Sequence, residues 1–569
     1  MIKKVKNSRL NIFDIVLALL IIAIPVLVSF QGYDLDDTGT HIFNALHLFD
    51  PEVQTTSQIF YSNLITYVFY RIFGGFGLVS VFMLNAAVYI VSAFLSVNIL
   101  KDVMPRTYAL AGSLVSVAVE MKFIHVVSYN TYTVLFFVIC CLFLYKGMTD
   151  KKHSGLNFLL CGIFGGLSVF VRLPNLLIIL LGAAFIYWAV VNAMKFSEFA
   201  AKVLIYLFGF AAAVGFSILL IVLLNKAFDA NIMLLGVSSS MNRGVSYSFS
   251  ELLGVYISTA FEALSGVWYI LLPIFFTVCG MLCGRIKNKI VSTVLYIACF
   301  GATVGFSVKF MLDGVPRNLF PVSCWIVLLL TFVLSNTKKQ YDPKLAALSI
   351  MAVVISVVTF AGSNTGISHA NLCLNLALPI AIYEVSVLLK AVEVDAAGRV
   401  LRKTLALMLS VVFVYNYVYF STTYFELTDR AEIVYSVDSP KLKGLYTSKF
   451  KSEYAKTVIE KVAPLDNKYM IVYPGYDLFY YLTDKKPYTG ECGIFFKSYS
   501  IERLKSDMEN NGDKELPIVL FSKTEPYSVT GEGRSARDEK WQVISEFMDE
   551  NSYTVYYSDE YTEIYIPTE

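Results

Sequence analysis

The sequence predicts a polytopic α-helical membrane protein of about 13 spans, with a cytoplasmic N-terminus and a C-terminal α/β domain outside the membrane. Composition is the first indication, because 56% of the 569 residues are hydrophobic and only 16% are charged, whereas soluble domains carry about 25% charged residues. The second is a series of apolar runs of roughly 20 residues, each long enough to cross a ~30 Å hydrocarbon core. The third is a change beyond Ser421, where apolar segments shorten to strand length and charges become frequent.

The apolar runs define a predicted membrane domain, residues 1–420. Its first run, Ile12 to Phe30, is longer than the apolar core of a signal peptide and lacks a small-residue cleavage site, so we expect a retained helix. The predicted spans cover residues 12–30, 77–100, 107–119, 131–146, 156–171, 175–193, 203–225, 264–283, 290–311, 318–335, 345–362, 372–390 and 404–420.

Lysine and arginine residues set the expected orientation of these spans. When the N-terminus is placed in the cytoplasm, the cytoplasmic loops carry about three times as many of these residues as the loops on the opposite side. The positive-inside rule therefore predicts a cytoplasmic N-terminus, and an odd number of spans places the C-terminus outside.

Residues 421–569 are predicted to form one external α/β domain. The segment KYMIVYPG indicates a buried strand that ends in a turn at Pro474-Gly475, YDLFYYLT a helix, and LPIVLFS a second strand. KWQVISEFMDEN is typical of an amphipathic helix and is followed by a hairpin that turns at Ser558-Asp559. No catalytic triad or metal site is recognisable here, so we expect a cap that guides substrate or binds a partner.

The remaining patterns argue against several classes of function. Eight of the nine cysteines lie in or beside apolar runs, where cysteine acts as a small hydrophobe, and only Cys492 lies in the external domain. The sequence has neither a metal-spaced Cys/His pattern nor a glycine-rich phosphate loop after a strand. We therefore expect no metal, no other cofactor and no nucleic-acid partner.

An acidic cluster follows the first span directly, in the stretch GYDLDDTGTH. Asp34, Asp36 and Asp37 occur within four positions, and His41 lies one helical turn beyond Asp37. One interpretation is a hydrated turn at the membrane surface. The other is that one carboxylate faces a cavity, where desolvation raises its pKa and makes it a better general base at neutral pH.

Cationic residues occur on the same predicted face, at the ends of spans. Each alone is typical of a side chain that extends from a span to the interface, but together they suit a phosphate-bearing ligand, for which the planar fork of arginine is the better clamp. The candidates are Arg172, Arg243, Arg317 and Lys122.

These motifs resemble those of the GT-C superfamily of integral-membrane glycosyltransferases, such as protein O-mannosyltransferases and aminoarabinose transferases. The family has an acidic motif in its first external loop, usually Asp-Glu with an aromatic residue or His a few positions later; Asp37-Thr38-Gly39-Thr40-His41 matches it, with Thr38 in place of Glu. The Gly-rich span that ends in Arg-x-Pro (GGLSVFVRLPN) and the element from Arg317 to Pro321 also match, although Asn318 stands where the family often has Tyr.

One position departs from the family pattern. Relatives often carry an acidic residue in the second external loop, in connection with metal or acceptor handling, whereas this chain has SYNTYT, with Asn130 at that position. Glu120 is the nearest carboxylate, and Tyr129, Asn130 and Glu120 are therefore candidates for contact with the acceptor or with the catalytic group. A neutral Asn argues against a bound divalent metal, and none is predicted.

The resemblance implies a mechanism and a location. A polyprenyl-phosphate sugar would lie with its chain between spans, in a bacterial cytoplasmic membrane, and its sugar in the external cavity. Asp37 would take the proton from an acceptor hydroxyl of a glycan, lipid or protein, and attack opposite the phosphate would invert the anomeric carbon. Arginine residues would stabilise the leaving phosphate; Asp34, Asp36 and His41 are alternative or supporting groups.

Two other classes of function stay open at this point. A transporter or flippase for lipid-linked saccharides would need a continuous polar path across the bilayer, but ionisable residues deep in the spans are scarce. A polysaccharide polymerase or ligase would also use lipid-linked donors, but such proteins typically carry their large loop between late spans rather than a C-terminal domain.

Overall fold

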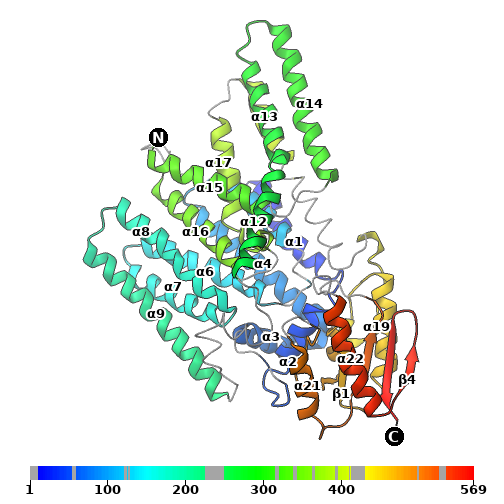
Figure 1. Cartoon of the computed structure of the whole chain (residues 1–569). Helices are drawn as coiled ribbons and strands as arrows, with labels where there is room; N and C mark the ends of the chain where they lie inside the picture. The colour runs from blue at the N-terminus through cyan, green and yellow to red at the C-terminus, as the bar shows by residue number, and fades with distance from the viewer. Residues whose placement is uncertain are drawn as a thin grey trace.

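The computed structural model describes residues 11–53, 55, 59–120, 125, 128–224, 249–313, 319–337, 342–361, 366–390, 395–408, 411, 430–495, 499–524 and 534–568. Within these ranges a large helical body is joined to a smaller domain built on a five-stranded sheet (Figure 1). The predicted combination of a polytopic helical part and a C-terminal α/β part is confirmed in this coarse form. The predicted boundary at residues 420/421 lies outside the described residues.

The helical body follows the apolar runs of the sequence. Its elements are α1 (Ile12–Val28), α2 (Asp37–Leu46), α3 (Phe60–Phe73), η2 (Gly74–Phe76), α4 (Leu78–Leu100), α5 (Arg106–Glu120), α6 (Tyr129–Thr149), α7 (Ser154–Val169), η4 (Leu173–Leu181), α8 (Gly182–Val191), α9 (Phe196–Leu223), α12 (Phe249–Ser265), α13 (Trp268–Cys283), α14 (Lys289–Asp313), α15 (Leu319–Thr337), α16 (Pro343–Phe360), η5 (Gly366–Cys373) and α17 (Ala377–Lys390). A further helix covers residues 396–408.

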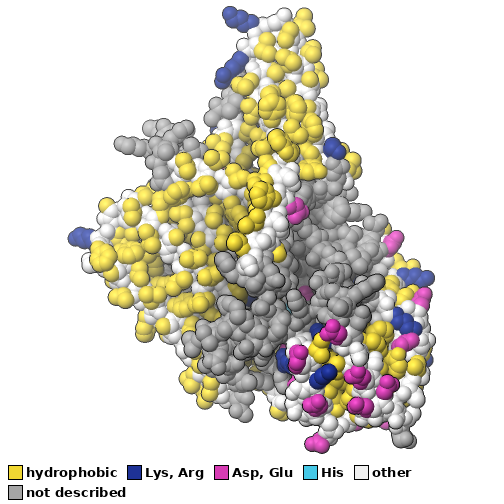
Figure 2. Space-filling model, in the orientation of Figure 1, with side chains coloured by type: hydrophobic (Ala, Val, Ile, Leu, Met, Phe, Trp, Pro, Cys, Tyr) yellow, Lys and Arg dark blue, Asp and Glu magenta, His cyan; other side chains and the backbone are white. Residues whose placement is uncertain are grey.

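Several of these helices are suited to a membrane. In the described part of the chain, seven helical stretches are long and apolar enough to span it, and four shorter apolar helices accompany them. Figure 2 shows apolar side chains over α8, α9, α13 and α14, whereas lysines and carboxylates gather over the C-terminal domain. Only 11% of the most apolar part of α14 is buried within the protein, and such an apolar, uncovered helix is suited to contact with lipid.

Two predicted spans have a different form. The segment predicted at 372–390 is divided into η5 and α17, which meet at an angle of 86°; Pro379, which has no N–H to donate, fits the first turn of α17. The segment predicted at 264–283 begins earlier, because α12 and α13 together give an apolar stretch over Leu253–Cys283. Most of the last predicted span, 404–420, lies outside the described residues.

The C-terminal domain contains the predicted strands. Its elements are η6 (Arg430–Glu432), η7 (Pro440–Leu442), α19 (Lys449–Val462), β1 (Tyr469–Tyr473), α20 (Leu478–Thr483), β2 (Lys486–Pro487), α21 (Ile501–Asn510), β3 (Ile518–Ser522), α22 (Arg534–Glu550), β4 (Tyr553–Ser558) and β5 (Thr562–Pro567). The strand order is β2-β1-β3-β5-β4, in which β1 pairs parallel with β2 and β3, and β5 pairs antiparallel with β3 and β4.

Both faces of β1, an inner strand of the sheet, are buried. Alternate side chains of a strand point to opposite faces, and here Ile471 packs in a cluster with Ile544 of α22, whereas Met470 and Val472 join the large core that also contains residues of α2 and α20. The sheet is therefore covered on one side by α22 and on the other by elements that reach the helical body.

The connection between α1 and α4, residues 29–77, is the part of the helical body that holds the C-terminal domain. We call it the first loop; it contains α2 and α3. Gly32 N–H donates to the Tyr446 carbonyl (2.6 Å) and Leu478 N–H to the Leu35 carbonyl (2.9 Å). At Gly39 the approach is so close that a Cβ atom would lie 1.9 Å from the backbone nitrogen of Leu478.

Gly39→Ala is therefore expected to destabilise the protein by about 1–3 kcal/mol, the usual range for overpacking, because the overlap is with backbone atoms that cannot change rotamer. The measurement is thermal unfolding of the purified protein in detergent, together with limited proteolysis of the C-terminal domain. Gly215→Ala in α9, where an added Cβ would meet no atom within 4 Å, is the matched control and should lose no stability. Equal unfolding temperatures for the two variants would contradict the close docking.

Candidate functional site

The acidic stretch of the first loop lies at the N-terminus of α2. Asp37 is the first residue of the helix and Asp36 precedes it. Asp34 Oδ2 accepts the backbone N–H of Thr38 (2.8 Å). The first N–H groups of a helix have no partner within the helix and carry partial positive charge. The helix terminus therefore stabilises the carboxylates gathered around it.

Asp36 connects this stretch to the C-terminal domain. Its Oδ1 accepts the backbone N–H of Tyr476 (2.6 Å), in the turn between β1 and α20. Asp34 and Asp36 are only 8% and 5% exposed. Both side chains therefore bind backbone N–H groups and stabilise the conformation of the loop. This role differs from that of a base, which the sequence also allowed for either residue.

Asp37 has a different environment from its two neighbours. Its side chain is exposed, yet desolvation is the largest cause that raises its pKa from 3.8 to about 7, followed by the charges of Asp34 and Asp36. An accessible carboxyl group that is nevertheless strongly desolvated lies in a recess rather than on the outer surface. Of the three aspartates, Asp37 alone combines access with a pKa near neutrality.

A fourth carboxyl group, Asp477, comes from the C-terminal domain. It is fully buried, and its Oδ2 accepts the hydroxyl of Thr40 (2.6 Å). Asp34, Asp36, Asp37 and Asp477 together form what we call the acid cluster. Sequence reasoning missed Asp477, although it lies just after the carboxyl end of a buried parallel strand, where functional side chains of α/β sheets often occur.

His41 and Tyr129 are two further polar side chains of the site. The His41 ring stands edge-on to the Tyr129 ring, with centroids 5.3 Å apart. Burial lowers the pKa of His41 to about 4, so the imidazole is neutral at physiological pH. Tyr129, the first residue of α6, lies within electrostatic range of both Asp37 and Arg172.

Arg172 lies between α7 and η4 and is 7% exposed. Its guanidinium group donates to the carbonyls of Thr359 (2.6 Å) and Ala361 (3.1 Å) at the end of α16, and it lies 6.0 Å from the centroid of the Tyr129 ring. The structure thus brings together Asp37, His41, Tyr129 and Arg172, from three separate parts of the sequence.

Other predicted site residues are placed only in part. Asn130 Oδ1 pairs with His369 Nε2 of η5 (3.2 Å), a histidine that the sequence pattern did not single out. Thr38, which replaces the acidic residue of the family motif, donates to the carbonyl of His125 (2.6 Å) in the second loop. The side chain of Glu120, at the end of α5, and the residues Lys122, Arg243 and Arg317 lie outside the described part of the structure.

The arrangement of the acid cluster does not suit a metal ion. Among the residues that the structure describes, no group of three or more His, Cys, Asp or Glu side chains is arranged to hold one. Asp34 and Asp36 accept backbone N–H groups, and Asn130 pairs with His369. One oxygen atom of each of these three side chains is thus occupied by a contact within the protein.

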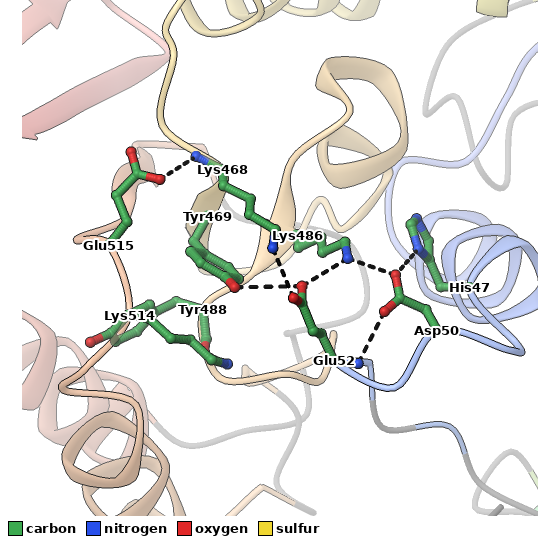
Figure 3. Close-up of polar contacts among 9 residues, drawn as sticks. All are labelled: His47, Asp50, Glu52, Lys468, Tyr469, Lys486, Tyr488, Lys514 and Glu515. Atoms are coloured by element: carbon green, nitrogen blue, oxygen red, sulfur yellow. Dashed lines mark hydrogen bonds and ion pairs between the residues drawn. The ribbon is translucent and has the colours of Figure 1, made fainter. Parts of the chain in front are cut away.

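A second group of charges joins the first loop to the C-terminal domain (Figure 3). Lys486 Nζ lies 2.7 Å from Asp50 and 2.8 Å from Glu52, and Lys468 Nζ lies 2.8 Å from Glu52. Hydrogen bonds from the two lysines lower the pKa of Glu52 to about 2. Because these groups are partly exposed, each pair contributes only about 0–1 kcal/mol.

Asp37→Asn is expected to raise thermal stability more at about pH 8 than at about pH 5. Folding raises the pKa of the Asp37 carboxyl group from 3.8 to about 7. The wild type therefore loses stability as the pH rises between these two pKa values, because the folded state must bury an ionised group. Asp50→Asn is the control with the opposite sign. Burial raises the pKa of Asp50, but hydrogen bonds and charge, chiefly from Lys486, outweigh burial and lower the pKa to about 2. The Asp50→Asn variant should therefore lose stability at both pH values. A pH-independent effect of Asp37→Asn would contradict the assigned environment.

Comparison with known proteins addresses the fold. No family model and no curated protein sequence matches the chain. Among solved structures, the oligosaccharyltransferase of Archaeoglobus fulgidus in complex with Zn and sulfate is 12% identical, with a TM-score of 0.51 over 98% of this chain and 73% of that chain. ArnT from Cupriavidus metallidurans, bound to undecaprenyl phosphate, is 11% identical, with a TM-score of 0.47 over 97% of both chains.

The similarity to the oligosaccharyltransferase spans the helical body and the C-terminal domain alike. At this identity it concerns the fold and not the chemistry. The chain thus shares the fold of this oligosaccharyltransferase, in agreement with the resemblance of its sequence motifs to the GT-C superfamily.

Proposed function

We propose that this protein is an integral-membrane glycosyltransferase that transfers a sugar from a polyprenyl-phosphate donor to an acceptor hydroxyl, with inversion at the anomeric carbon. The observation that carries the proposal is the environment of Asp37, an accessible carboxyl group whose pKa is raised to about 7. The acceptor is a glycan, lipid or protein of the cell envelope.

Asp37 is the general base of the proposed reaction. It removes the proton of the acceptor hydroxyl while the hydroxyl oxygen attacks the anomeric carbon from the face opposite the phosphate. The bond between the anomeric carbon and the phosphate oxygen breaks, and polyprenyl phosphate leaves with the bonding electron pair. A base whose pKa lies near the working pH is ionised in a useful fraction of molecules and still accepts a proton readily.

Arg172 is the described residue that we assign to the donor phosphate. Two of its contacts are to backbone carbonyls, and a guanidinium group carries five N–H donors, so the same side chain can hold the end of α16 and also reach a phosphate oxygen. The charge that develops on the leaving phosphate would be stabilised there. We assign Arg243, Arg317 and Lys122 to the same phosphate on sequence grounds.

The neutral and polar neighbours are assigned to the sugar and the acceptor. His41, kept neutral by burial, can donate or accept a hydrogen bond without adding charge beside Asp37. Tyr129, which is within electrostatic range of both Asp37 and Arg172, is assigned to the reacting sugar. Asn130 and Glu120 are assigned to the acceptor side.

The proposed setting is a bacterial cytoplasmic membrane, with the acid cluster and the C-terminal domain on the extracytoplasmic side. The excess of lysine and arginine in the loops predicted to be cytoplasmic supports this orientation. A lipid-linked donor in the bilayer would also account for a chain without a nucleotide-sugar binding motif. We propose no metal or other cofactor and no nucleic-acid partner.

Asp37→Asn is expected to reduce transfer from a panel of polyprenyl-phosphate sugars by about 10²–10⁴-fold, the usual contribution of a general base. In the wild type, transfer should rise with pH through about 7 as Asp37 ionises. Asp50→Asn, in the same loop but paired with Lys486, should stay active.

The outcomes of this experiment separate the candidate functions. Unchanged transfer by Asp37→Asn would remove this residue from the role of base. Failure of the wild type with every donor would contradict the transferase and favour a transporter or flippase for lipid-linked saccharides.

Arg172→Lys is expected to raise the donor KM and lower transfer by about tenfold, because an ammonium group cannot make the paired bonds of a planar guanidinium fork. Steady-state kinetics with varied donor concentration measure this change. Arg71→Lys, in which the replaced side chain lies over the Tyr67 ring 5.9 Å from its centroid, is the control and should keep wild-type kinetics. Equal donor KM values in both variants and the wild type would refute the phosphate assignment.

A further inference from the structure

One turn of the C-terminal domain contacts the first loop on both sides of Asp37. Tyr476 N–H donates to Asp36 and Leu478 N–H to the Leu35 carbonyl, before Asp37 in the sequence. Between them, Asp477 accepts the hydroxyl of Thr40, after Asp37. Three consecutive residues of the domain thus fix the segment that carries the proposed base.

Asp477 is an unusual member of this contact because it is buried and none of the described groups that act on it is a cation. The groups that face it are Thr40 of α2, Asp36 and Asp37 of the first loop, Tyr480 of α20, and Cys492 with the backbone N–H of Gly493. Its second oxygen, Oδ1, is buried and has no hydrogen-bond partner in the described structure. A charged carboxylate in such a place is costly, whereas a neutral carboxyl group is much less so.

We propose that Asp477 is a positioning residue for Asp37, which it holds through Thr40 while its own carboxyl group is protonated. The proposal rests on the proposed role of Asp37 as the base. Loss of the proton from Asp477 would place a further negative charge beside Asp36 and Asp37, where no cation faces it among the residues that the structure describes. The repulsion would separate the turn from the start of α2 and misplace the base.

The environment of Asp477 sets the pH at which this change is expected. Burial is the largest cause that raises its pKa to about 8, and the charges of Asp36 and Asp37 add to the shift. The hydrogen bonds from the Thr40 hydroxyl and from the backbone of Gly493 oppose it. Asp37 itself titrates near 7. Between these two pKa values Asp37 is mostly ionised and Asp477 is mostly neutral. We therefore expect activity over a pH range whose lower limit is set by Asp37 and whose upper limit is set by Asp477.

The test compares Asp477→Asn, Asp477→Ala and Thr40→Val with the wild type in pH–rate profiles. Wild-type transfer should rise through about pH 7 and fall above about pH 8. Asp477→Asn, a neutral side chain of the same shape that can still accept from Thr40, should recover most of the activity that Asp477→Ala loses and should lack the alkaline fall. Below the pH of the alkaline fall, Asp477→Ala and Thr40→Val should be about tenfold slower than the wild type, since one aligned hydrogen bond is lost.

Asp484→Asn is the matched control. Asp484 lies at the other end of α20, its side chain is exposed, and it forms an ion pair with Lys441 (2.6 Å). Its pH profile should equal that of the wild type. An alkaline fall of the same size in Asp477→Asn and the wild type would overturn the proposal, and so would equal losses in Asp477→Asn and Asp477→Ala.

Hydrogen–deuterium exchange of peptides from residues 36–46 tests the contact between Asp477 and Thr40 without any sugar donor. After correction for intrinsic rates, protection should fall between about pH 6.5 and 9 in the wild type, stay constant in Asp477→Asn, and be low throughout in Asp477→Ala. If the protein transfers sugar from none of the polyprenyl-phosphate substrates but exchange behaves in this way, the positioning contact stands and the proposed chemistry fails. If exchange in α2 is the same in all variants, the positioning role is refuted.

Discussion

The structure depends on the docking of one turn, residues 476–478, against the start of α2. The backbone N–H of Leu478 donates to the carbonyl of Leu35, and Gly39 leaves room for the approach because it has no side chain. Backbone hydrogen bonds of this kind leave little freedom in register. The C-terminal domain is therefore part of the candidate site and not only a cover over it.

The docking also determines how the four carboxyl groups differ. Asp34 and Asp36 accept backbone N–H groups, contacts that favour the charged form of a carboxyl group. For Asp37 and Asp477, desolvation is the largest influence, and it raises the pKa of each carboxyl group. Environments that separate the pKa values of neighbouring acids are how proteins assign different tasks to chemically equal groups.

Much of the fold could be predicted from the sequence, because the long apolar runs, the short apolar run of β1 and the turn at Pro474-Gly475 are local signals. Asp37 and its two neighbours were found in the same way, from their position after a span. Asp477 and His369 were missed because their importance comes from contacts with residues hundreds of positions away, which no local pattern encodes. The break between η5 and α17 was missed for a similar reason, since hydropathy measures apolar content and not direction.

The central claim is that Asp37 is an accessible carboxyl group that titrates near neutrality. Infrared difference spectroscopy of the purified protein as a function of pH measures it directly, in the Asp477→Asn background so that the neighbouring acid cannot titrate. The account predicts a carboxylic acid band that disappears around pH 7 and is absent when Asp37 is also replaced by Asn. A band that has already disappeared at about pH 5, as for an ordinary hydrated aspartate, would contradict it.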